Sequence, residues 1–206
     1  MQATNPTDQH VPARQVRAVF DNRTVTVYQA YSPAIAEPAL TAGRFVPPFK
    51  LDRMTWIKPS FLWMMYRCGW ATKPGQERVL AISISRDGFE WALTHSTLSH
   101  HDPGVYADHA EWAERAEAMP VRIQWDPERS LQLQPLSHRS IQVGLTGDAA
   151  RHYVQDWTAD ITDVTGLAGE IHGLVTDGRL TEARQRLPAE RPYPLPGNLK
   201  AVIGAS

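Results

Sequence analysis

The chain has 206 residues, with 21 Lys and Arg against 22 Asp and Glu, one Cys and seven Trp. A single Cys excludes an internal disulfide and a cysteine-based zinc cluster. With 42% hydrophobic and 21% charged residues, the composition is typical of a globular chain and not of a disordered one. The balanced charge argues against a protein whose whole surface binds nucleic acid, although it permits a local basic patch.

The length predicts a single domain. No segment approaches the roughly 18 consecutive apolar residues of a membrane helix, and residues 1–17 lack the apolar core of a signal peptide. We therefore expect a soluble, cytoplasmic protein that does not bind membranes. Residues 1–13 predict a flexible lead-in, residues 14–190 one α+β domain, and residues 191–206 a Pro-rich tail.

The first elements are extended. Residues 14–20 alternate polar and apolar residues, and residues 23–31 are rich in β-branched and aromatic residues. A two-residue turn signal separates them, so together they predict a β-hairpin. A helix is then expected to begin after Ser32, which is followed by Pro, and to end at Gly43.

Residues 53–70 are the densest aromatic segment. A short strand is expected up to Lys58, because Pro59 biases its predecessor toward extended geometry. Ser60 can cap a helix that runs to about Cys68. This helix is apolar nearly all round, so we expect it to be buried.

The remaining chain predicts further strands and, late in the sequence, the best helices. Residues 94–111 are interpreted as a loop, Asp126-Pro127 as a turn, and residues 160–165 as a helix start. The expected strands are 78–85, 121–125, 131–134 and 139–145, and the expected helices are 111–118, those beginning at residues 146 and 165, and 181–185. Early strands with late helices are typical of an α+β domain.

One candidate site mixes cations with aromatic rings, and no carboxylate occurs between residues 53 and 73. Arg can bind a phosphate with two hydrogen bonds, while Trp or Tyr stacks on a base. The alternative is that the aromatic residues are core, which we favour for Trp63. Lys58 is harder to explain as core, because it must pair, reach solvent or bind a ligand. The members are Arg53, Trp56, Lys58, Trp63, Tyr66, Arg67 and Trp70.

Two glutamines are further candidates. Gln29 lies where a strand passes into a helix, a common ligand position, and alternation places it on one face with Tyr31 and opposite Tyr28. Gln142 stands between apolar residues of an expected strand and needs a partner. That partner is either a ligand hydroxyl or a neighbouring backbone group.

A histidine-rich segment offers potential metal ligands. Its spacing matches no compact metal-binding motif, so we expect a solvated loop and no metal site. The segment contains His95, His100, His101, Asp102, Asp108 and His109.

The segments VYQAYSPAIAEPALTAGRF, RMTWIKPSFLWMMYRCGW, SIQVGL and ITDVT resemble domain-of-unknown-function family 4291, over nearly the whole chain. More distantly, the order of elements is similar to that of ADP-ribosyltransferases, especially the DNA-modifying toxins of toxin–antitoxin systems. This resemblance implies a mixed or antiparallel split β-sheet with flanking helices. It also implies NAD as the cofactor and a nucleotide-type ligand.

The ADP-ribosyltransferase resemblance implies that Gln29, Lys58 and Gln142 occupy the catalytic positions. In that superfamily a Glu stabilises the ribosyl cation, whereas Gln142 is neutral; Glu90 and Asp126 are carboxylates that could replace it. The implied NAD-contacting residues are Tyr28, Tyr31, Arg53, Thr55, Trp56, Tyr66 and Arg67.

Three functional hypotheses follow from these residues and this resemblance. The first is an NAD-using, ADP-ribosyltransferase-like enzyme that modifies nucleic acid or protein. The second is a non-catalytic module that binds a nucleotide or nucleic acid, which leaves the two glutamines unproblematic. The third is an interaction protein without a small ligand.

Overall fold

A computed structural model describes residues 11–206; most of the expected lead-in, residues 1–10, lies outside the described residues. The strands are β1 (Arg17–Ala18), β2 (Thr24–Tyr31), β3 (Thr55–Ile57), β4 (Arg78–Ser85), β5 (Ser96–Leu98), β6 (Val121–Arg129), β7 (Pro135–Leu145), β8 (Thr158–Asp163) and β9 (Arg191–Pro192). The helices are α1 (Pro33–Ala42), α2 (Phe61–Cys68), α3 (Arg86–Thr94), α4 (His109–Ala118), α5 (Gly147–His152), the π-helical turn η1 (Tyr153–Trp157), α6 (Thr165–Thr176), α7 (Leu180–Arg186) and α8 (Gly197–Ile203).

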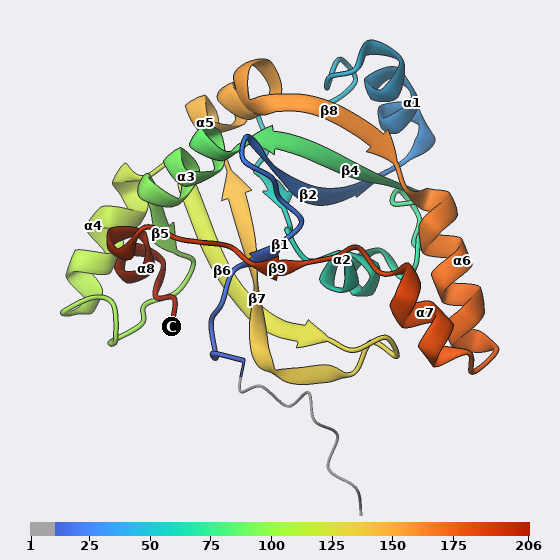
Figure 1. Cartoon of the computed structure of the whole chain (residues 1–206). Coiled ribbons are helices and arrows are strands. Elements are labelled where there is room, and N and C mark those ends of the chain that lie inside the picture. The colour runs from blue at the N-terminus through green and yellow to red at the C-terminus, as the bar shows by residue number, and fades with distance from the viewer. Residues whose placement is uncertain (1–10) are drawn as a thin grey trace, which may run out of the picture.

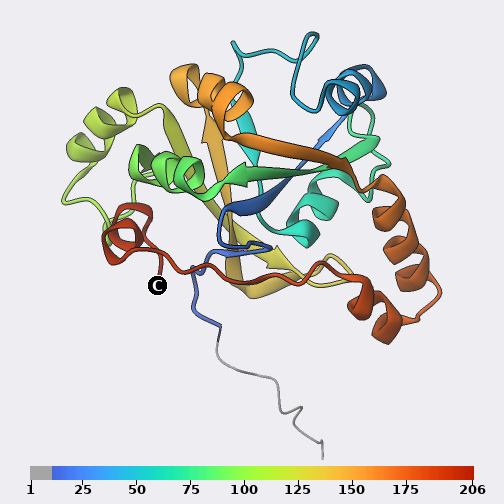
Figure 2. The same ribbon diagram turned by 45° about the horizontal axis from the view of Figure 1, so that its top comes forward.

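The strands form two main sheets (Figure 1). In one, β4 lies between β2 and β8 and is antiparallel to both. In the other the order is β3-β7-β6-β5, antiparallel except where β5 runs parallel to β6. In both views α3, α4 and α8 lie at the left and α6 and α7 at the right, whereas α1 and α5 lie toward the top and α2 lies between the two ends (Figures 1 and 2). The chain is therefore a single α+β domain with mixed and antiparallel sheets.

The main core lies between the two sheets. Alternation in β2 turns Val25 and Val27 toward this core, where both are fully buried. Ile82 of β4 belongs to the same cluster, as do Ile123 of β6 and Val143 of β7. Burial of these branched side chains removes apolar surface from water and holds the sheets together.

A second apolar cluster covers the other face of β2, where Tyr28 packs with α2. The Ser60 hydroxyl accepts a hydrogen bond from the Trp63 N–H at 3.1 Å, which caps the helix. Gly69 ends it in the left-handed conformation, with φ 59°. The expected buried helix is thus confirmed, and α6 and α7 contribute residues to the same cluster.

The two sheets meet at one antiparallel bridge between Tyr28 of β2 and Lys58, which follows β3. The Tyr28 N–H donates to the Lys58 carbonyl at 2.7 Å. Residues next to this bridge, among them Gln29 and Trp56, line a cleft. The cleft is the setting of the candidate site.

The expected hairpin of residues 14–20 and 23–31 is wrong in its first strand. Residues 14–20 hold only the short β1, and β1 pairs with β9 instead of β2. Contact with β2 is a bridge between Phe20 and Val25. The Tyr193 N–H donates to the Val16 carbonyl at 2.9 Å, so a segment distant in sequence occupies this edge.

The Pro-rich segment 191–206 packs on the core, where a tail was expected. Leu199 and Ile203 of α8 are buried, and their spacing of four places both on one helical face. The Trp125 indole donates to the Ile203 carbonyl at 2.7 Å. The prolines shape the connection that leads to α8.

The β6–β7 hairpin corrects two further expectations. The predicted turn at Asp126-Pro127 lies inside β6, and the predicted strand 131–134 is the hairpin loop. Pro127 is tolerated in β6 because the pairing of β5 with β6 ends at Ile123. The N–H that Pro127 lacks would therefore face no partner strand on that side.

Two strands besides β9 were not anticipated. β5 lies within the expected loop 94–111, and β8 covers the first part of segment 160–165. The expected helix start itself is confirmed, because α6 begins at Thr165 and Asp163 Oδ1 accepts from the Thr165 N–H at 2.8 Å. β8 is an edge strand whose one buried side chain is Ile161, so its sequence carries little alternation. β5 is only as long as Ser96–Leu98, which is too short to produce a pattern.

Candidate functional site

Two adjoining cavities occupy the cleft between the sheets. The junction cavity, about 450 Å³, is lined from β2, β3, α2 and the loop that follows α1. The hairpin cavity, also about 450 Å³, is lined from α2 and the β6–β7 hairpin. Trp56, Lys58 and Arg67 line both cavities, so the two are chambers of one site.

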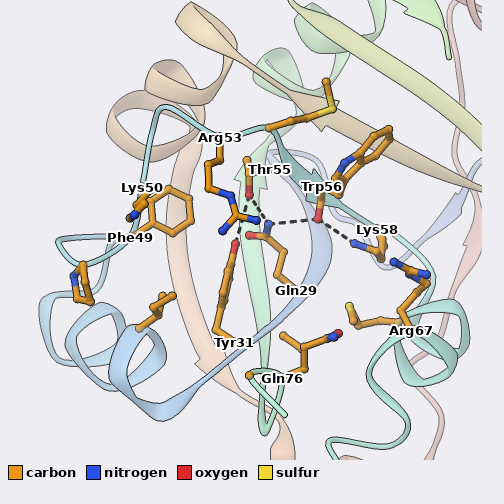
Figure 3. A pocket seen from close by; sticks show the side chains of 16 residues that line it. Gln29, Tyr31, Phe49, Lys50, Arg53, Thr55, Trp56, Lys58, Arg67 and Gln76 are labelled. Atoms are coloured by element: carbon orange, nitrogen blue, oxygen red, sulfur yellow. Dashed lines mark hydrogen bonds between the residues drawn. The ribbon is translucent and has the colours of Figure 1, made fainter. Parts of the chain in front are cut away.

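Gln29 holds the wall of the junction cavity together (Figure 3). Its side-chain amide donates to the Thr55 hydroxyl at 2.8 Å and to the Trp56 carbonyl at 3.2 Å. Its side-chain oxygen accepts from the Tyr153 hydroxyl at 2.6 Å. The residue is 3% exposed and its amide is used at both ends, so Gln29 positions its neighbours and has little capacity left for a ligand.

Two phenols fix the orientation of this network. Burial raises the pKa of Tyr153 and of Tyr31 above the ordinary value, so both hydroxyls keep their protons. The Tyr153 hydroxyl therefore donates, and Gln29 must turn its oxygen toward it. The Tyr31 hydroxyl lies 3.2 Å from the Thr55 hydroxyl and closes the network toward the cavity.

Lys58 is the buried cation that both cavities share. Its ammonium donates to the Trp56 carbonyl at 3.0 Å, and the residue is 7% exposed. Burial, and after it repulsion by Arg67, lowers the pKa of the Lys58 amine to about 7, although Asp126 opposes this shift. At neutral pH the amine therefore holds its proton far less tightly than an ordinary lysine, and it can either bind an anion or accept a proton.

The junction cavity combines cations with rings. Figure 3 shows Arg53, Lys50 and Arg67 around it, together with Phe49 and Trp56. Guanidinium groups bind phosphate through two parallel hydrogen bonds, and rings stack on a planar base. This wall suits a ligand that carries both phosphate and a flat ring.

The hairpin cavity contains an oriented carboxylate. The Gln142 amide donates to Asp126 Oδ2 at 2.6 Å, and the Gln124 amide donates to Asp126 Oδ1 at 3.0 Å. Gln124 and Gln142 are paired across β6 and β7, so both lie on one face of the sheet. Asp126 thus stands in the cavity with both oxygens held in place.

The model of one protein family, described as a domain of unknown function (DUF4291), matches residues 15–193. The chain belongs to this family. The match runs from before β1 to beyond β9 and includes the residues of both cavities. A search of curated proteins finds no match.

In this DUF4291 chain the fold brings most of the sequence-predicted site residues together. Gln29 and Lys58 line the junction cavity, and Lys58 and Gln142 line the hairpin cavity. Of the residues expected to contact NAD, Tyr66 lines the hairpin cavity and Trp56 and Arg67 line both cavities. The junction cavity is lined in addition by Tyr31, Arg53 and Thr55.

Other candidates lie elsewhere in the fold. Tyr28 is on the opposite face of β2 and packs edge-on against Phe61, with ring centroids 5.4 Å apart. Trp70, a candidate for stacking on a ligand, is buried and stacks on His172 at 5.3 Å. Glu90 of α3 accepts a hydrogen bond from the Tyr193 hydroxyl at 2.6 Å, outside both cavities.

The sequence named Asp126, with Glu90, as a carboxylate that could replace the missing Glu, but it did not show that Gln124 and Gln142 orient this carboxylate. Asp126 was interpreted as a turn residue because Pro127 follows it. The available signal was the spacing of Gln124 and Asp126, which puts both on one face of a strand. That signal has meaning only once β6 is known to continue past Trp125.

Among residues 11–206, no group of three or more His, Cys, Asp and Glu side chains is arranged to hold a metal ion. No helix in that part of the chain is both long enough and apolar enough to span a membrane.

Proposed function

We propose that this DUF4291 protein is a cytoplasmic, ADP-ribosyltransferase-like enzyme that uses NAD and transfers ADP-ribose to nucleic acid or protein. The observation that carries the proposal is the position of the Asp126 carboxylate in the hairpin cavity, which Lys58 also lines. The Gln142 amide holds this carboxylate with a hydrogen bond of 2.6 Å. A ribosyl cation needs a fixed negative charge beside it. Asp126 supplies the charge that the neutral Gln142 lacks.

In this proposal the reaction breaks the glycosidic bond between C1′ of the ribose and the nicotinamide nitrogen. Nicotinamide leaves with the electron pair of that bond as a neutral ring, and the ribosyl group carries the positive charge. An acceptor oxygen or nitrogen then forms the new bond to C1′ with its own lone pair. The acceptor's proton passes to the neutral amine of Lys58 or to solvent.

The junction cavity is suited to hold the dinucleotide. Arg53 and Arg67 provide guanidinium groups for the two phosphates, and Phe49 and Trp56 provide rings for the adenine. Each cavity, at about 450 Å³, falls within the range of about 300–1,000 Å³ typical of small-molecule sites. Gln29, which is fully hydrogen-bonded within the protein, acts here as a positioning residue.

One observation favours the second candidate, a module that binds nucleotides without turnover. Both ends of the Gln29 amide are occupied by protein groups, so the first catalytic position of the resemblance is structural here. A binding module needs the cations and rings of the junction cavity and makes no demand on Asp126. The two candidates therefore differ in what replacement of Asp126 does.

The decisive experiment is incubation with radiolabelled NAD and mixed nucleic acid and protein, following nicotinamide release and label transfer. We expect the Asp126→Asn variant to lose about 100-fold or more of the nicotinamide release, the typical cost of losing one preorganised electrostatic partner, while calorimetry shows retained NAD binding. Glu90→Gln, which changes a carboxylate outside both cavities, is the matched control and is expected to keep full activity. Heat of binding without turnover in the wild type favours the binding module, and absence of both contradicts both candidates.

A further inference from the structure

A third cavity, of about 250 Å³, lies beside the start of α2 and is separate from the two cavities of the cleft. The segment between α7 and β9 crosses α2 here (Figure 1), and Glu190 of this segment accepts the Phe61 N–H at 2.7 Å. The β6 strand adds a second carboxylate, that of Glu128, so two acids share one small cavity. The apolar residues of its wall are Phe61, Leu62, Leu136, Leu187 and Pro188.

The two carboxylates have no cation that balances them. Among residues 11–206, neither Glu128 nor Glu190 forms an ion pair. Arg17 lines the cavity, but its guanidinium donates to the backbone carbonyl of Glu190 at 3.4 Å. Arg129 also lines it, but its guanidinium lies 3.6 Å from the centroid of the Tyr66 ring. Carboxylates held away from water are costly without a counter-ion, so they are paired or they keep a proton.

In the free protein, protonation resolves this cost. Burial raises the pKa of Glu128, and it raises that of Glu190 to about 8. Repulsion by the neighbouring Glu128 adds to the shift of Glu190. Glu190 therefore keeps its proton at neutral pH. A cation placed between the two carboxylates would favour their charged forms and release that proton.

The geometry favours an ammonium group over a guanidinium or a metal ion. Each carboxylate already uses one oxygen for a backbone N–H, since Glu190 accepts from Phe61 and Glu128 accepts from Arg129 at 2.8 Å. A guanidinium fork needs both oxygens of one carboxylate, whereas an ammonium is a compact charge that can bind one oxygen of each. Among residues 11–206, no third acidic, His or Cys side chain is arranged with them to hold a metal ion.

We propose that this cavity binds a primary alkylammonium group on an apolar stem of about four carbons. A lysine side chain of another protein and a free alkyl amine share this chemistry. The ammonium binds between Glu128 and Glu190, and the stem packs against the leucines of the wall. Leu136 is 38% exposed, so the stem can enter beside it from the surface. The site lies outside the cleft, so the inference does not depend on the proposed chemistry.

The first test compares ligands by calorimetry on the full chain, with n-butylamine as the probe. We expect n-butylamine to bind at least about tenfold more tightly than n-butanol, which has the same shape without the charge, and than butylguanidine. It should also bind at least about tenfold more tightly than methylamine, because each buried methylene adds affinity. Equal binding of amine and alcohol overturns the inference, and so does tighter binding of Mg²⁺ or Ca²⁺ than of the amine.

Variants locate the binding. Glu190→Gln and Glu128→Gln are each expected to weaken n-butylamine binding about tenfold or more, whereas Glu114→Gln, at an exposed position of α4, is the matched control and should bind like the wild type. Leu136→Ala removes part of the apolar wall and should weaken binding of n-butylamine but not of methylamine. Thermal unfolding shows whether each variant is folded. Unchanged binding of n-butylamine by the folded variants overturns the inference.

The pH dependence is an independent measurement. Because the bound state needs the Glu190 carboxylate charged, the affinity for n-butylamine should rise with pH up to about 8 and then level off. Arg17, Glu128, Arg129 and His138 also face the cavity. Burial lowers the pKa of His138, whose loss of a proton at lower pH contributes a rise of the same sign. Glu190→Gln should remove the part of the rise near pH 8. An affinity that does not change with pH overturns the inference.

Two further probes distinguish the sources of the ammonium group. A tripeptide with blocked ends and a central lysine presents the side chain on a backbone, and diaminopentane presents a free amine. Binding of the tripeptide as tight as that of n-butylamine supports a lysine of a partner protein as the ligand. Binding of diaminopentane without binding of the tripeptide supports a free amine. Binding of neither overturns the inference.

Discussion

Two regions bordering α2 bury ionisable side chains, a base in one and acids in the other. On one side lies the cleft with Lys58, and on the other the cavity of about 250 Å³ that contains Glu128 and Glu190. Burial raises the pKa of Glu190 to about 8, although a hydrogen bond from the Phe61 N–H at 2.7 Å opposes this shift. Burial lowers the pKa of Lys58 to about 7. In both regions low water access disfavours the charged form.

The difference between the two regions lies in their partners. Glu190 accepts the first free N–H of α2, so it joins the segment after α7 to the helix that lines the cleft. The cleft instead retains a buried donor that the described residues do not satisfy, the indole N–H of Trp63. Burial of an ionisable group is therefore not sufficient to show what the group binds.

The largest effect is expected for Lys58→Met. Loss of the charge should weaken binding of NAD or another nucleotide by roughly 10–100-fold, the range for one charge-assisted hydrogen bond. Removal of a buried ammonium should at the same time increase the free energy of unfolding near neutral pH, by on the order of a few kcal/mol. Calorimetry and urea unfolding measure the two effects.

The pH dependence sharpens this prediction. The Lys58 amine has a pKa of about 7 in the folded state against an ordinary 10.5, so its contribution makes stability rise between those values. Lys58→Met should lack this rise, whereas Lys200→Met on α8 should retain it. Retained nucleotide affinity together with lowered stability would show that Lys58 is structural.

The next effect is expected for Glu190→Gln, with the opposite sign. The folded state keeps the Glu190 proton up to about pH 8, but the unfolded chain loses it near 4.5, so wild-type stability falls as the pH rises between those values. The variant should lack this fall, on the order of a few kcal/mol, because Gln does not titrate. Its side-chain oxygen can still accept from the Phe61 N–H. Glu128 and His138 line the same cavity, where burial raises the pKa of Glu128 and lowers that of His138, so both contribute slopes of their own.

Urea unfolding at about pH 5 and about pH 8 measures this difference. Glu114→Gln, at an exposed position of α4, is the control and should follow the wild type at both pH values. If Glu190→Gln loses stability equally at both, the residue acts only through its hydrogen bond to α2.

The smallest effect is expected for Tyr153→Phe. Loss of the 2.6 Å hydrogen bond leaves the buried oxygen of Gln29 without a donor, which should cost about 1–3 kcal/mol of unfolding free energy. Tyr66→Phe removes a hydroxyl from a residue that is 36% exposed and should change stability little. Nicotinamide release should fall only modestly, because Gln29 positions Trp56 and does not react. A loss as large as that of Asp126→Asn would assign Gln29 a direct part in the chemistry.

Interactions between residues close in sequence determined several helices and strands, and they determined which side chains of β2 face the cleft. Ser60 and Gly69 bound α2 because a hydroxyl caps the free N–H groups and glycine adopts a left-handed conformation at little cost. Alternation in β2 put Gln29 and Tyr31 on one face and Tyr28 on the other, as the structure has them. These features depend on residues a few positions apart.

Only the tertiary structure decided what the site contains. Asp126 becomes an oriented carboxylate because β7 returns Gln142 to its side, and Lys58 joins both cavities because Tyr28 bridges to it across the sheets. Glu190 reaches the first N–H of α2 from 129 positions away in the chain. No local pattern encodes these pairings, because each depends on which distant segments the collapse of the shared core brings together.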